Sequence, residues 1–298
     1  MRVFVTGATG FIGSALVPEL ISAGHQVLGL TRSEAGAKSL AAAGAEVHRG
    51  SLEDLESLKS GAAKSDGVIH LAFNHDFSQY QANSEADRRV IDAIGSVLIG
   101  SDRPFVVSAG VGVSTAGRAA TENDACMPSS ILPRSASEEA ALSLAQRGAR
   151  ASVMRLPQVH NLEKQGLITL LVMIAREKGV SAYVGDGANR WSAAHLLDVA
   201  RLYALALEKG SGGARYHAIG EEGVPLRQIA EVIGRRLNLP IVSKSLEEAP
   251  DHFGWMSLMV GRDAPASSAI TRERLGWRPV GPGLLADLER AHNLENLT

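Results

Sequence analysis

The chain has 298 residues, of which 45% are hydrophobic and 21% charged, and its net charge is −2. This length holds one large α/β domain or a nucleotide-binding domain with a smaller partner, and the charge gives no reason to expect a nucleic acid or an anionic membrane as partner. No run of 18 apolar residues is present, and the single cysteine, Cys126, rules out an intramolecular disulfide. With no signal peptide visible, we expect a cytoplasmic protein.

The first thirteen residues, MRVFVTGATGFIG, combine a β-prone run with three glycines spaced three apart. Residues 12–23 then predict an amphipathic helix. In this context Gly7 allows a tight turn, Gly10 allows backbone N–H groups to approach a pyrophosphate, and Gly13 allows the helix to pack close to the strand. The helix N-terminus faces the anion with its unpaired N–H groups. The stretch therefore predicts a dinucleotide-binding site.

A second strand is predicted at residues 26–30, and it is followed by Arg32 and Ser33, with no carboxylate before Glu34. The end of this strand lies beside the adenosine ribose in a dinucleotide fold. A carboxylate there accepts hydrogen bonds from the 2′-OH of NAD, whereas a guanidinium and a hydroxyl accommodate the 2′-phosphate of NADP. We therefore expect NADP(H) as cofactor; the alternative is that Arg32 is a solvated surface residue.

The next elements continue the alternation of strands and helices, and Ser51 is the expected N-cap of the third helix, with Asp54 as acidic partner. The predicted strands lie at 46–48, 67–73, 104–108 and 150–155, and the predicted helices at 34–43, 52–60, 84–98 and 134–147. Six strands between residues 2 and 155 predict an α/β fold, a doubly wound parallel sheet of Rossmann type. Residues 1–155 are thus expected to form a dinucleotide-binding domain.

The pattern changes after residue 155. Helices are predicted at 167–178, 197–208, 224–237 and 284–294, a short helical turn at 271–275, and strands at 215–219 and 240–243. We expect residues 156–298 to form a smaller, mostly helical substrate-binding portion over the carboxyl ends of the strands. No linker separates the two parts, so they are expected to be interleaved, with about 193–219 returning to the Rossmann domain.

A polar stretch follows the fourth strand at residues 74–83 and carries three groups that can handle protons, His75, Asp76 and Tyr80. Open α/β sheets place ligand-binding loops at such strand ends. Spacing alone does not show that these side chains converge. His70, within the strand itself, is expected to be a buried histidine with satisfied hydrogen bonds.

The chain resembles the short-chain dehydrogenase/reductase superfamily, in particular its extended members, the NAD-dependent epimerase/dehydratase group. The resemblance covers nearly the whole chain. It rests on TGATGFIG at 6–13, VIHLAF at 68–73, VVSAG at 106–110, MRLPQVH at 154–160, GDGANRWSAAHLLDVARLYALAL at 185–207 and LGWRP at 275–279.

The resemblance implies a set of contacts along the cofactor. Residues expected beside the pyrophosphate are Gly7, Thr9, Gly10, Phe11 and Ile12. Those expected beside adenine are Ser51 and Leu52. Those expected around the nicotinamide and its ribose are Leu71, Ala72, Phe73, Ser108, Pro157, Val159 and His160. Those expected to face the substrate are His75, Asn189, Arg190, Trp191 and His195.

The chain departs from the family at its catalytic pair. The family's chemistry depends on Tyr-x-x-x-Lys after the fifth strand, where Tyr passes a proton to the carbonyl. Here Arg134 stands in place of Tyr and Glu138 in place of Lys. The four tyrosines supply no other Tyr-x-x-x-Lys. The family's serine is also displaced, since Ser108 ends the strand and Ser114 lies further along.

Three readings follow from this departure. The first is an NADP(H)-dependent reductase of a small-molecule carbonyl or imine with a different proton donor, for which Tyr80, His75, Ser108 and His160 are candidates. Arg134 would polarise the carbonyl electrostatically. The second is a catalytically silent NADP(H)-binding sensor, and the third is a nucleotide-sugar epimerase or dehydratase. We expect a small-molecule substrate and no metal site, and the resemblance makes a homodimer plausible.

Overall fold

The computed structural model describes residues 1–111, 117–292 and 294. In β1 (Arg2–Thr6), successive apolar side chains point to opposite faces of the strand and contribute to two different cores. Val3 and Val5 pack on one face of the main sheet, and Phe4 packs on the other. Both faces of the strand are therefore buried, as expected for a central strand of a parallel sheet.

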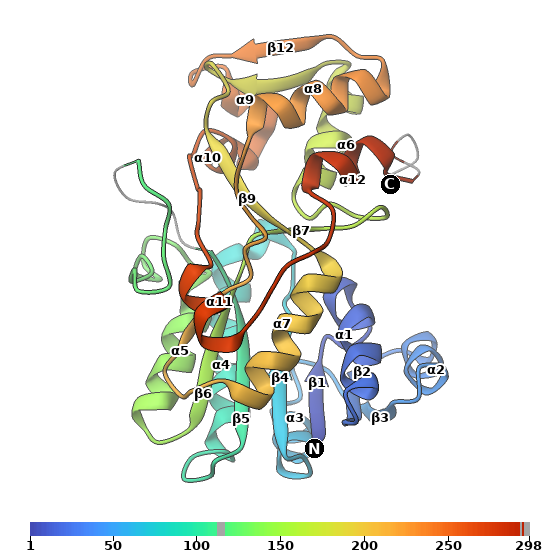
Figure 1. Cartoon of the computed structure of the whole chain (residues 1–298), viewed down its shortest axis with the longest axis vertical. Helices are drawn as coiled ribbons and strands as arrows, with labels where there is room; N and C mark the ends of the chain where they lie inside the picture. Colours follow the sequence, from blue (N-terminus) through green and yellow to red (C-terminus); the bar gives the residue numbers. More distant parts are fainter. Residues whose placement is uncertain (112–116, 293, 295–298) are drawn as a thin grey trace.

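The main sheet has seven parallel strands in the order β10-β6-β5-β4-β1-β2-β3 (Figure 1). The chain order reverses between β1 and β4, so their carboxyl ends form the topological switch point at which open α/β sheets bind ligands. The remaining strands of the sheet are β2 (Gln26–Thr31), β3 (Glu46–Arg49), β4 (Gly67–His70), β5 (Pro104–Gly110), β6 (Arg150–Leu156) and β10 (Arg215–His217).

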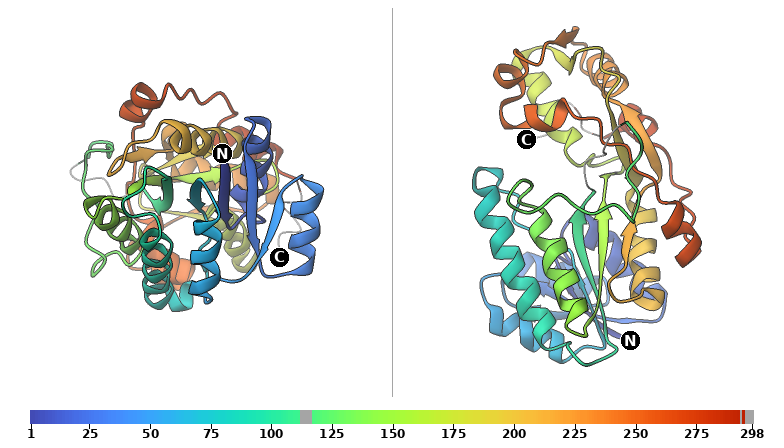
Figure 2. Two further views of the ribbon diagram at one scale, coloured as in Figure 1. Left: turned by 90° about the horizontal axis from the view of Figure 1, so that it is seen from below. Right: turned by 90° about the vertical axis from the view of Figure 1, so that its left-hand side faces the viewer.

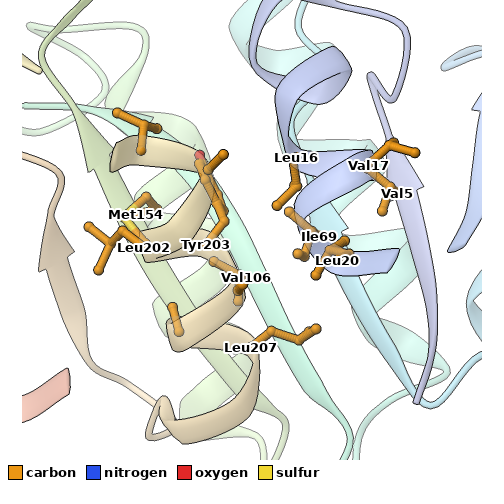
Figure 3. Close-up of a cluster of buried hydrophobic side chains, with 14 of the residues drawn as sticks. Val5, Leu16, Val17, Leu20, Ile69, Val106, Met154, Leu202, Tyr203 and Leu207 are labelled. Carbon is orange, nitrogen blue, oxygen red and sulfur yellow. The ribbon is translucent and has the colours of Figure 1, made fainter. Parts of the chain in front are cut away.

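Helices cover both faces of this sheet. On one face α1 (Phe11–Ser22) and α7 (Leu196–Lys209) share a core to which Leu16, Leu20 and Leu207 contribute (Figure 3). On the other face lie α3 (Leu55–Ala63), α4 (Tyr80–Ser96) and α5 (Ser135–Gln146). This domain also contains α2 (Glu34–Ala42) and the short helix η1 (Phe77–Gln79). This arrangement confirms the doubly wound fold predicted from the sequence.

A smaller lobe lies beyond the carboxyl ends of the strands (Figures 1 and 2). Its two small sheets have the orders β11-β9-β7 and β12-β8, and they pack with helices around a separate apolar core. Its strands are β7 (Gln158–His160), β8 (Ser181–Val184), β9 (Arg190–His195), β11 (Glu221–Pro225) and β12 (Ile241–Lys244). Its helices are α6 (Ile168–Lys178), α8 (Leu226–Leu237), α9 (Ala249–Phe253), η2 (Gly254–Met256), α10 (Ser257–Val260) and α12 (Leu284–Arg290).

The chain crosses between the two parts several times. After β9, α7 packs on the main sheet and β10 pairs with β6, extending it by one strand. Helix α11 (Ala269–Leu275) then lies against α7, and the indole Nε1 of Trp277 donates to the Asp198 carbonyl at 3.0 Å. Residues 269–277 therefore return to the sheet domain as well.

Four local predictions need correction. The third helix begins at Leu55, and its N-cap is Asp54, whose carboxylate accepts the Ser57 N–H at 2.9 Å; Ser51 does not cap it. The fourth helix begins at Tyr80, four residues earlier than expected. The helix expected from residue 224 begins at Leu226, because Val224 pairs with Trp191 in a strand. The smaller lobe thus contains more β-structure than the helical pattern indicated.

Within the described residues, none of the helices combines the length and the apolar character that crossing a bilayer requires.

Candidate functional site

The glycine turn after β1 has the geometry of a phosphate-binding loop. Gly7 has φ +67°, and a Cβ there would lie 2.7 Å from the Ala72 backbone nitrogen. A Cβ on Gly13 would lie 2.1 Å from the Gly7 carbonyl oxygen, so the start of α1 packs directly on the turn. Gly10 caps α1 without a side-chain bond, and the first turn carries no acidic residue. The N–H groups at this helix start are therefore available to an anion.

The turn also brings together residues that the resemblance assigns to the cofactor. Leu71 donates its N–H to the Thr6 carbonyl at 3.3 Å, and Ala72 donates to the Thr6 hydroxyl, also at 3.3 Å. The end of β4 is thereby held against the glycine turn. These residues fit a pyrophosphate at the turn with a ribose beside Leu71 and Ala72.

The carboxyl end of β2, where the adenosine is expected, is followed by an exposed cation, Arg32. Within the part of the chain that the structure describes, Arg32 makes no ion pair closer than 4.0 Å. Its charge contributes to lowering the pKa of Glu53, after a hydrogen bond from Ser51 to that carboxylate. The Ser33 hydroxyl caps α2 by accepting the Gly36 N–H at 3.0 Å, which leaves its own proton free to donate. The sequence analysis did not identify Glu53.

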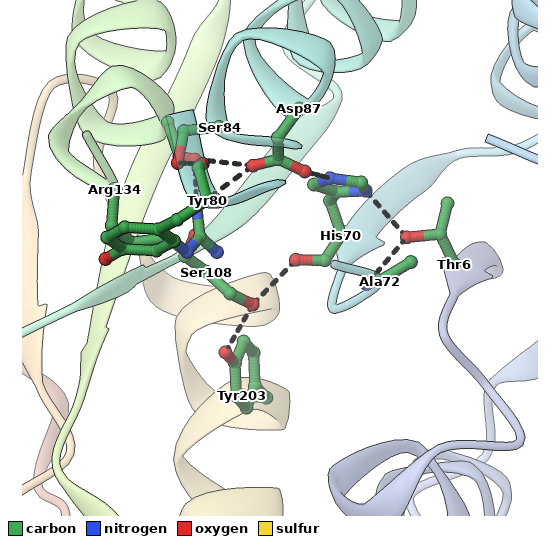
Figure 4. A network of polar contacts seen from close by, with 10 residues as sticks. Thr6, His70, Ala72, Tyr80, Ser84, Asp87, Ser108, Arg134 and Tyr203 are labelled. Atoms are coloured by element: carbon green, nitrogen blue, oxygen red, sulfur yellow. Dashed lines mark hydrogen bonds and ion pairs between the residues drawn. The ribbon is translucent and has the colours of Figure 1, made fainter. Parts of the chain in front are cut away.

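A chain of buried hydrogen bonds leads from β1 across β4 to α4 (Figure 4). His70 Nε2 lies 2.9 Å from the Asp87 carboxylate, and its Nδ1 lies 2.6 Å from the Thr6 hydroxyl. Because a carboxylate only accepts, Nε2 donates to Asp87 and Nδ1 accepts from Thr6 in the neutral imidazole. Both His70 and Asp87 are fully enclosed. The expectation of a satisfied, buried His70 is confirmed.

Asp87 connects this chain to Arg134. Burial alone would raise the pKa of the Asp87 carboxyl, but the contacts with His70, Arg134 and Ser137 lower it below its ordinary value. Arg134 Nη1 lies 3.0 Å from the carboxylate, and its Nη2 donates to the Ser108 carbonyl at 3.0 Å. The guanidinium carbon lies 4.1 Å from the centre of the Phe73 ring. Arg134 is thus held at the carboxyl ends of β4 and β5.

The Ser108 hydroxyl points away from Arg134 (Figure 4). It donates to the His70 carbonyl at 2.6 Å and lies 2.7 Å from the buried Tyr203 hydroxyl, which therefore donates to it. Both the proton and a lone pair of Ser108 are engaged inside the sheet domain. The site thus brings the Ser108 backbone, and not its hydroxyl, to Arg134; Ser114 lies outside the described residues.

Tyr80 reaches the start of α5 from the start of α4 (Figure 4). Burial raises the pKa of its phenol, while the Arg134 charge and a hydrogen bond from the Arg134 backbone oppose that rise. Arg134 is the residue that the sequence aligns with the family's tyrosine. The Tyr80 phenol, which comes from a different helix, thus lies beside Arg134 (Figure 4). His75 lies nearby, 5.2 Å from Phe73 between ring centres.

Glu138 occupies the family's lysine position but takes part in a structural network. It is 1% exposed, and its carboxylate accepts from Arg155 Nε and Nη2 at 2.7 and 2.6 Å and from Arg215 Nε at 2.7 Å. Burial alone would raise the Glu138 pKa, but the hydrogen bonds and charges of both arginines lower it. The network ties α5 to β6 and β10. The sequence pattern did not single out Arg155.

The sequence-predicted substrate residues of β9 and its preceding loop make contacts within the smaller lobe. Asn189 donates to the carbonyls of Val260 and Arg262 at 2.7 and 3.1 Å, and Trp191 is 4% exposed. His195 caps α7 through its ring, which accepts the Leu197 N–H at 3.3 Å.

His160, expected over the nicotinamide, is fully buried in β7. Its Nδ1 lies 2.8 Å from the Asp287 carboxylate, and its ring centre lies 5.8 Å from that of His195. Desolvation lowers the His160 pKa, although Asp287 opposes that effect. Of the neighbouring expected residues, Pro157 links β6 to β7, and Val159 lies within β7 and pairs with Ala194 of β9.

Comparison with known proteins identifies the family. A model of the NAD dependent epimerase/dehydratase family matches residues 3–219 of the chain. Because this match spans most of the sequence, the chain belongs to that family. A crystal structure of dTDP-glucose 4,6-dehydratase from Streptomyces venezuelae superposes with a TM-score of 0.77 at 19% identity, covering 97% of this chain and 96% of that one. At this identity the likeness shows the shared fold.

Two relatives in sequence are informative. Uncharacterized protein C2A9.02 of Schizosaccharomyces pombe is 49% identical over 97% of this chain and 98% of its own length. A 4-hydroxy-2-methyl-3-oxo-4-farnesyl-3,4-dihydroquinoline-1-oxide ketoreductase of Stigmatella aurantiaca is 28% identical, covering 89% of this chain and 84% of its own.

We predict that Gly13→Ala destabilises the protein by about 1–3 kcal/mol or more, because the added Cβ overlaps the Gly7 carbonyl. Equilibrium urea unfolding measures the effect. Gly110→Ala is the control, since its Cβ would meet nothing within 4 Å. Equal stability of the two variants would contradict the packing argument.

We predict that Glu138→Gln lowers the free energy of unfolding by about 3–5 kcal/mol at neutral pH, because Arg155 loses its buried partner. The folded-state pKa of Glu138 is lowered, so its contribution is present above about pH 4.5 and is lost as the pH falls through the folded-state value. The difference between wild type and variant should therefore narrow below that pH.

The adjacent Glu139 supplies a matched control. It pairs with Arg88 at 2.6 Å, but its side chain is 33% exposed, so Glu139→Gln should cost about 1 kcal/mol or less. A Glu138→Gln effect no larger than that of Glu139→Gln would show that the buried network does not stabilise the fold.

Proposed function

We propose that this member of the NAD dependent epimerase/dehydratase family is an NADP(H)-dependent oxidoreductase that reduces the carbonyl of a small molecule, with Tyr80 as proton donor. The observation that carries the proposal is that the Tyr80 phenol lies beside Arg134, which stands at the position where the family carries its tyrosine (Figure 4). The likeness to a ketoreductase over most of the chain supports the reaction class.

The glycine turn and the uncapped start of α1 would hold the cofactor's pyrophosphate. Arg32 and Ser33 would bind the 2′-phosphate, since one supplies a guanidinium and the other a hydroxyl proton. When bound, the cofactor supplies a hydride to the carbonyl carbon.

The chain's own residues supply the proton and the electrostatics. Tyr80 donates its phenolic proton to the carbonyl oxygen as negative charge develops there, and solvent then restores that proton. The Arg134 charge stabilises both the developing oxyanion and the phenolate left on Tyr80. The Asp87 carboxylate holds the guanidinium in place through its 3.0 Å contact. Arg134 thus acts without giving up a proton of its own.

Two alternatives remain as outcomes of experiment. A sensor would bind NADPH tightly yet turn over no carbonyl across a broad substrate panel. An epimerase or dehydratase would bind nucleotide sugars, which thermal-shift measurement detects. Neither is favoured by a specific contact among the described residues.

We predict that Arg32→Ala weakens NADPH binding by about 1–3 kcal/mol and leaves NADH binding nearly unchanged, because only NADPH carries the 2′-phosphate. Isothermal titration with both cofactors measures the two affinities. Lys38→Ala, which removes an exposed cation from α2, is the control. Equal weakening of both cofactors by Arg32→Ala would refute the NADP assignment.

The carboxylate of Glu53 gives an independent check that Arg32 binds the 2′-phosphate. Glu53→Gln removes the negative charge that shares the surroundings of Arg32. NADPH binding should tighten while NADH binding stays constant. No change for either cofactor would place the 2′-phosphate away from Arg32.

We predict that Tyr80→Phe lowers kcat for carbonyl reduction by about 10²–10⁴-fold with little change in KM or in NADPH affinity. Burial raises the pKa of the Tyr80 phenol above its ordinary value, so the phenol stays protonated at neutral pH, and kcat should fall only as the pH rises through this raised pKa. Steady-state kinetics between neutral and alkaline pH measures both effects.

Tyr183→Phe in the smaller lobe is the matched control, since that phenol ring packs under Arg227 at 5.6 Å. It should keep wild-type kcat. A Tyr80→Phe enzyme with undiminished kcat would rule out Tyr80 as donor while leaving the cofactor assignment intact.

A further inference from the structure

Aromatic side chains are scarce in this protein, yet they gather beside Arg134. The whole chain has 6 Phe, 3 Trp and 4 Tyr. Four of these thirteen, Phe73, Phe77, Tyr80 and Trp255, belong to one connected cluster with His75. We call these five residues the aromatic cluster.

The aromatic cluster starts at Arg134 and ends in the smaller lobe. The Arg134 guanidinium lies over Phe73, whose ring centre is 5.2 Å from that of His75. His75 and Phe77 are 6.1 Å apart, and Phe77 stacks on Trp255 with centres 4.4 Å apart and planes inclined by 20°. Four cluster residues follow the end of β4 in sequence, whereas Trp255 comes from η2 in the other part of the molecule.

Trp255 is held outward by its surroundings. Phe253 and Met256 on either side are 3% and 1% exposed in the lobe core, whereas Trp255 is 46% exposed. The chain a few residues further on is fixed by Asn189, which binds the Val260 carbonyl, and by Arg190, which pairs with Asp263 at 2.8 Å. A large aromatic surface is therefore presented from a fixed backbone instead of joining the core that its neighbours fill.

Two arginines near the expected substrate site already have carboxylate partners, whereas Lys164, whose charge contributes to lowering the pKa of His75, has no ion pair among the described residues. The matched arginines make a nucleoside diphosphate a less suitable ligand than a neutral one. Arg190, the cation of the expected substrate loop, has its charge matched by Asp263. Arg134 is matched by Asp87, and its unused donors suit a single carbonyl oxygen more than a doubly charged group. The cluster therefore combines one polar anchor with an extended apolar face.

We propose, resting on the reductase function above, that the substrate is a carbonyl compound bearing an aromatic or other bulky apolar group, and that Phe77 and Trp255 determine this specificity. The carbonyl oxygen lies toward Tyr80 and Arg134, and the apolar group packs on Phe77 and Trp255 across the two lobes. Aromatic stacking and apolar burial supply the discrimination.

The test compares two methyl ketones with the same reacting group, benzylacetone and acetone, and includes UDP-glucose as a sugar nucleotide. For the wild-type enzyme, kcat/KM for benzylacetone should exceed that for acetone by about tenfold or more. Trp255→Ala and Phe77→Ala should bring this ratio close to one. Leu258→Ala, which truncates a side chain 70% exposed on the neighbouring helix α10, should leave the ratio unchanged.

Binding is measured separately by intrinsic fluorescence with NADP⁺ present. Trp191 and Trp277 are 4% and 2% exposed, so Trp255 is the accessible reporter among the three tryptophans. Benzylacetone should quench wild-type emission and have little effect on Trp255→Phe emission, while Trp255→Phe should retain most of the kinetic preference. Acetone and UDP-glucose should leave the wild-type spectrum unaltered.

The kinetic and fluorescence measurements together distinguish a failure of the specificity proposal from a failure of the reductase proposal. Quenching by benzylacetone without any ketone turnover would overturn the reductase function and support the apolar site. Turnover with equal kcat/KM for the two ketones, or quenching by UDP-glucose alone, would overturn the specificity proposal and leave the reductase function standing.

Discussion

The buried carboxylate of Asp87 is the contact on which the geometry of the site depends. A carboxylate removed from water is several kcal/mol unfavourable unless charges and hydrogen bonds surround it. Here His70 and Arg134 lie within 3.0 Å of its oxygens, and Ser137 donates to it. Since these partners come from β4 and the start of α5, satisfying one charge fixes both elements against α4. The ends of the strands, the guanidinium and the Tyr80 phenol are positioned together as a consequence.

The same logic accounts for the residues in the family's catalytic positions. Arg134 and Glu138 are separated by one helical turn, yet they turn to different partners: Arg134 to Asp87 on α4, and Glu138 to Arg155 and Arg215 on β6 and β10. Each of these two residues, which replace the family's tyrosine and lysine, is thus paired with an opposite charge on another element. Ion pairs therefore connect the first turn of α5 to α4, β6 and β10. In the proposed mechanism, Tyr80 on α4 serves as proton donor instead of a residue of α5.

In the proposed function, the sheet domain binds the cofactor and holds the reacting group, and both parts contact the apolar group of the substrate. The sheet domain carries the glycine turn, the cation at the end of β2 and the polar chain from Thr6 to Arg134. The smaller lobe adds Trp255, which stacks directly on Phe77 of the sheet domain. A substrate bound between them would have its reacting group set by the rigid sheet and its apolar group selected by both lobes. This division follows from the topology, because all strands of the parallel sheet end at the edge that faces the smaller lobe.

Local sequence determined the parts of this protein that depend on local physics. The glycine spacing at 7, 10 and 13 and the strand-helix alternation predicted the doubly wound sheet, because turn geometry and apolar periodicity act over a few residues. Asp87 was recognisable only as a carboxylate on the apolar face of its helix, three and four residues before the buried Val90 and Ile91. Its partners lie 17 and 47 residues away, and the stacking of Phe77 on Trp255 joins residues still further apart. The Asp87 contacts depend on the packing of β4, α4 and α5 in the sheet domain, and the Phe77–Trp255 stacking depends on the chain's passage into the smaller lobe. Only the tertiary structure therefore decided which charges are matched and which aromatic faces meet.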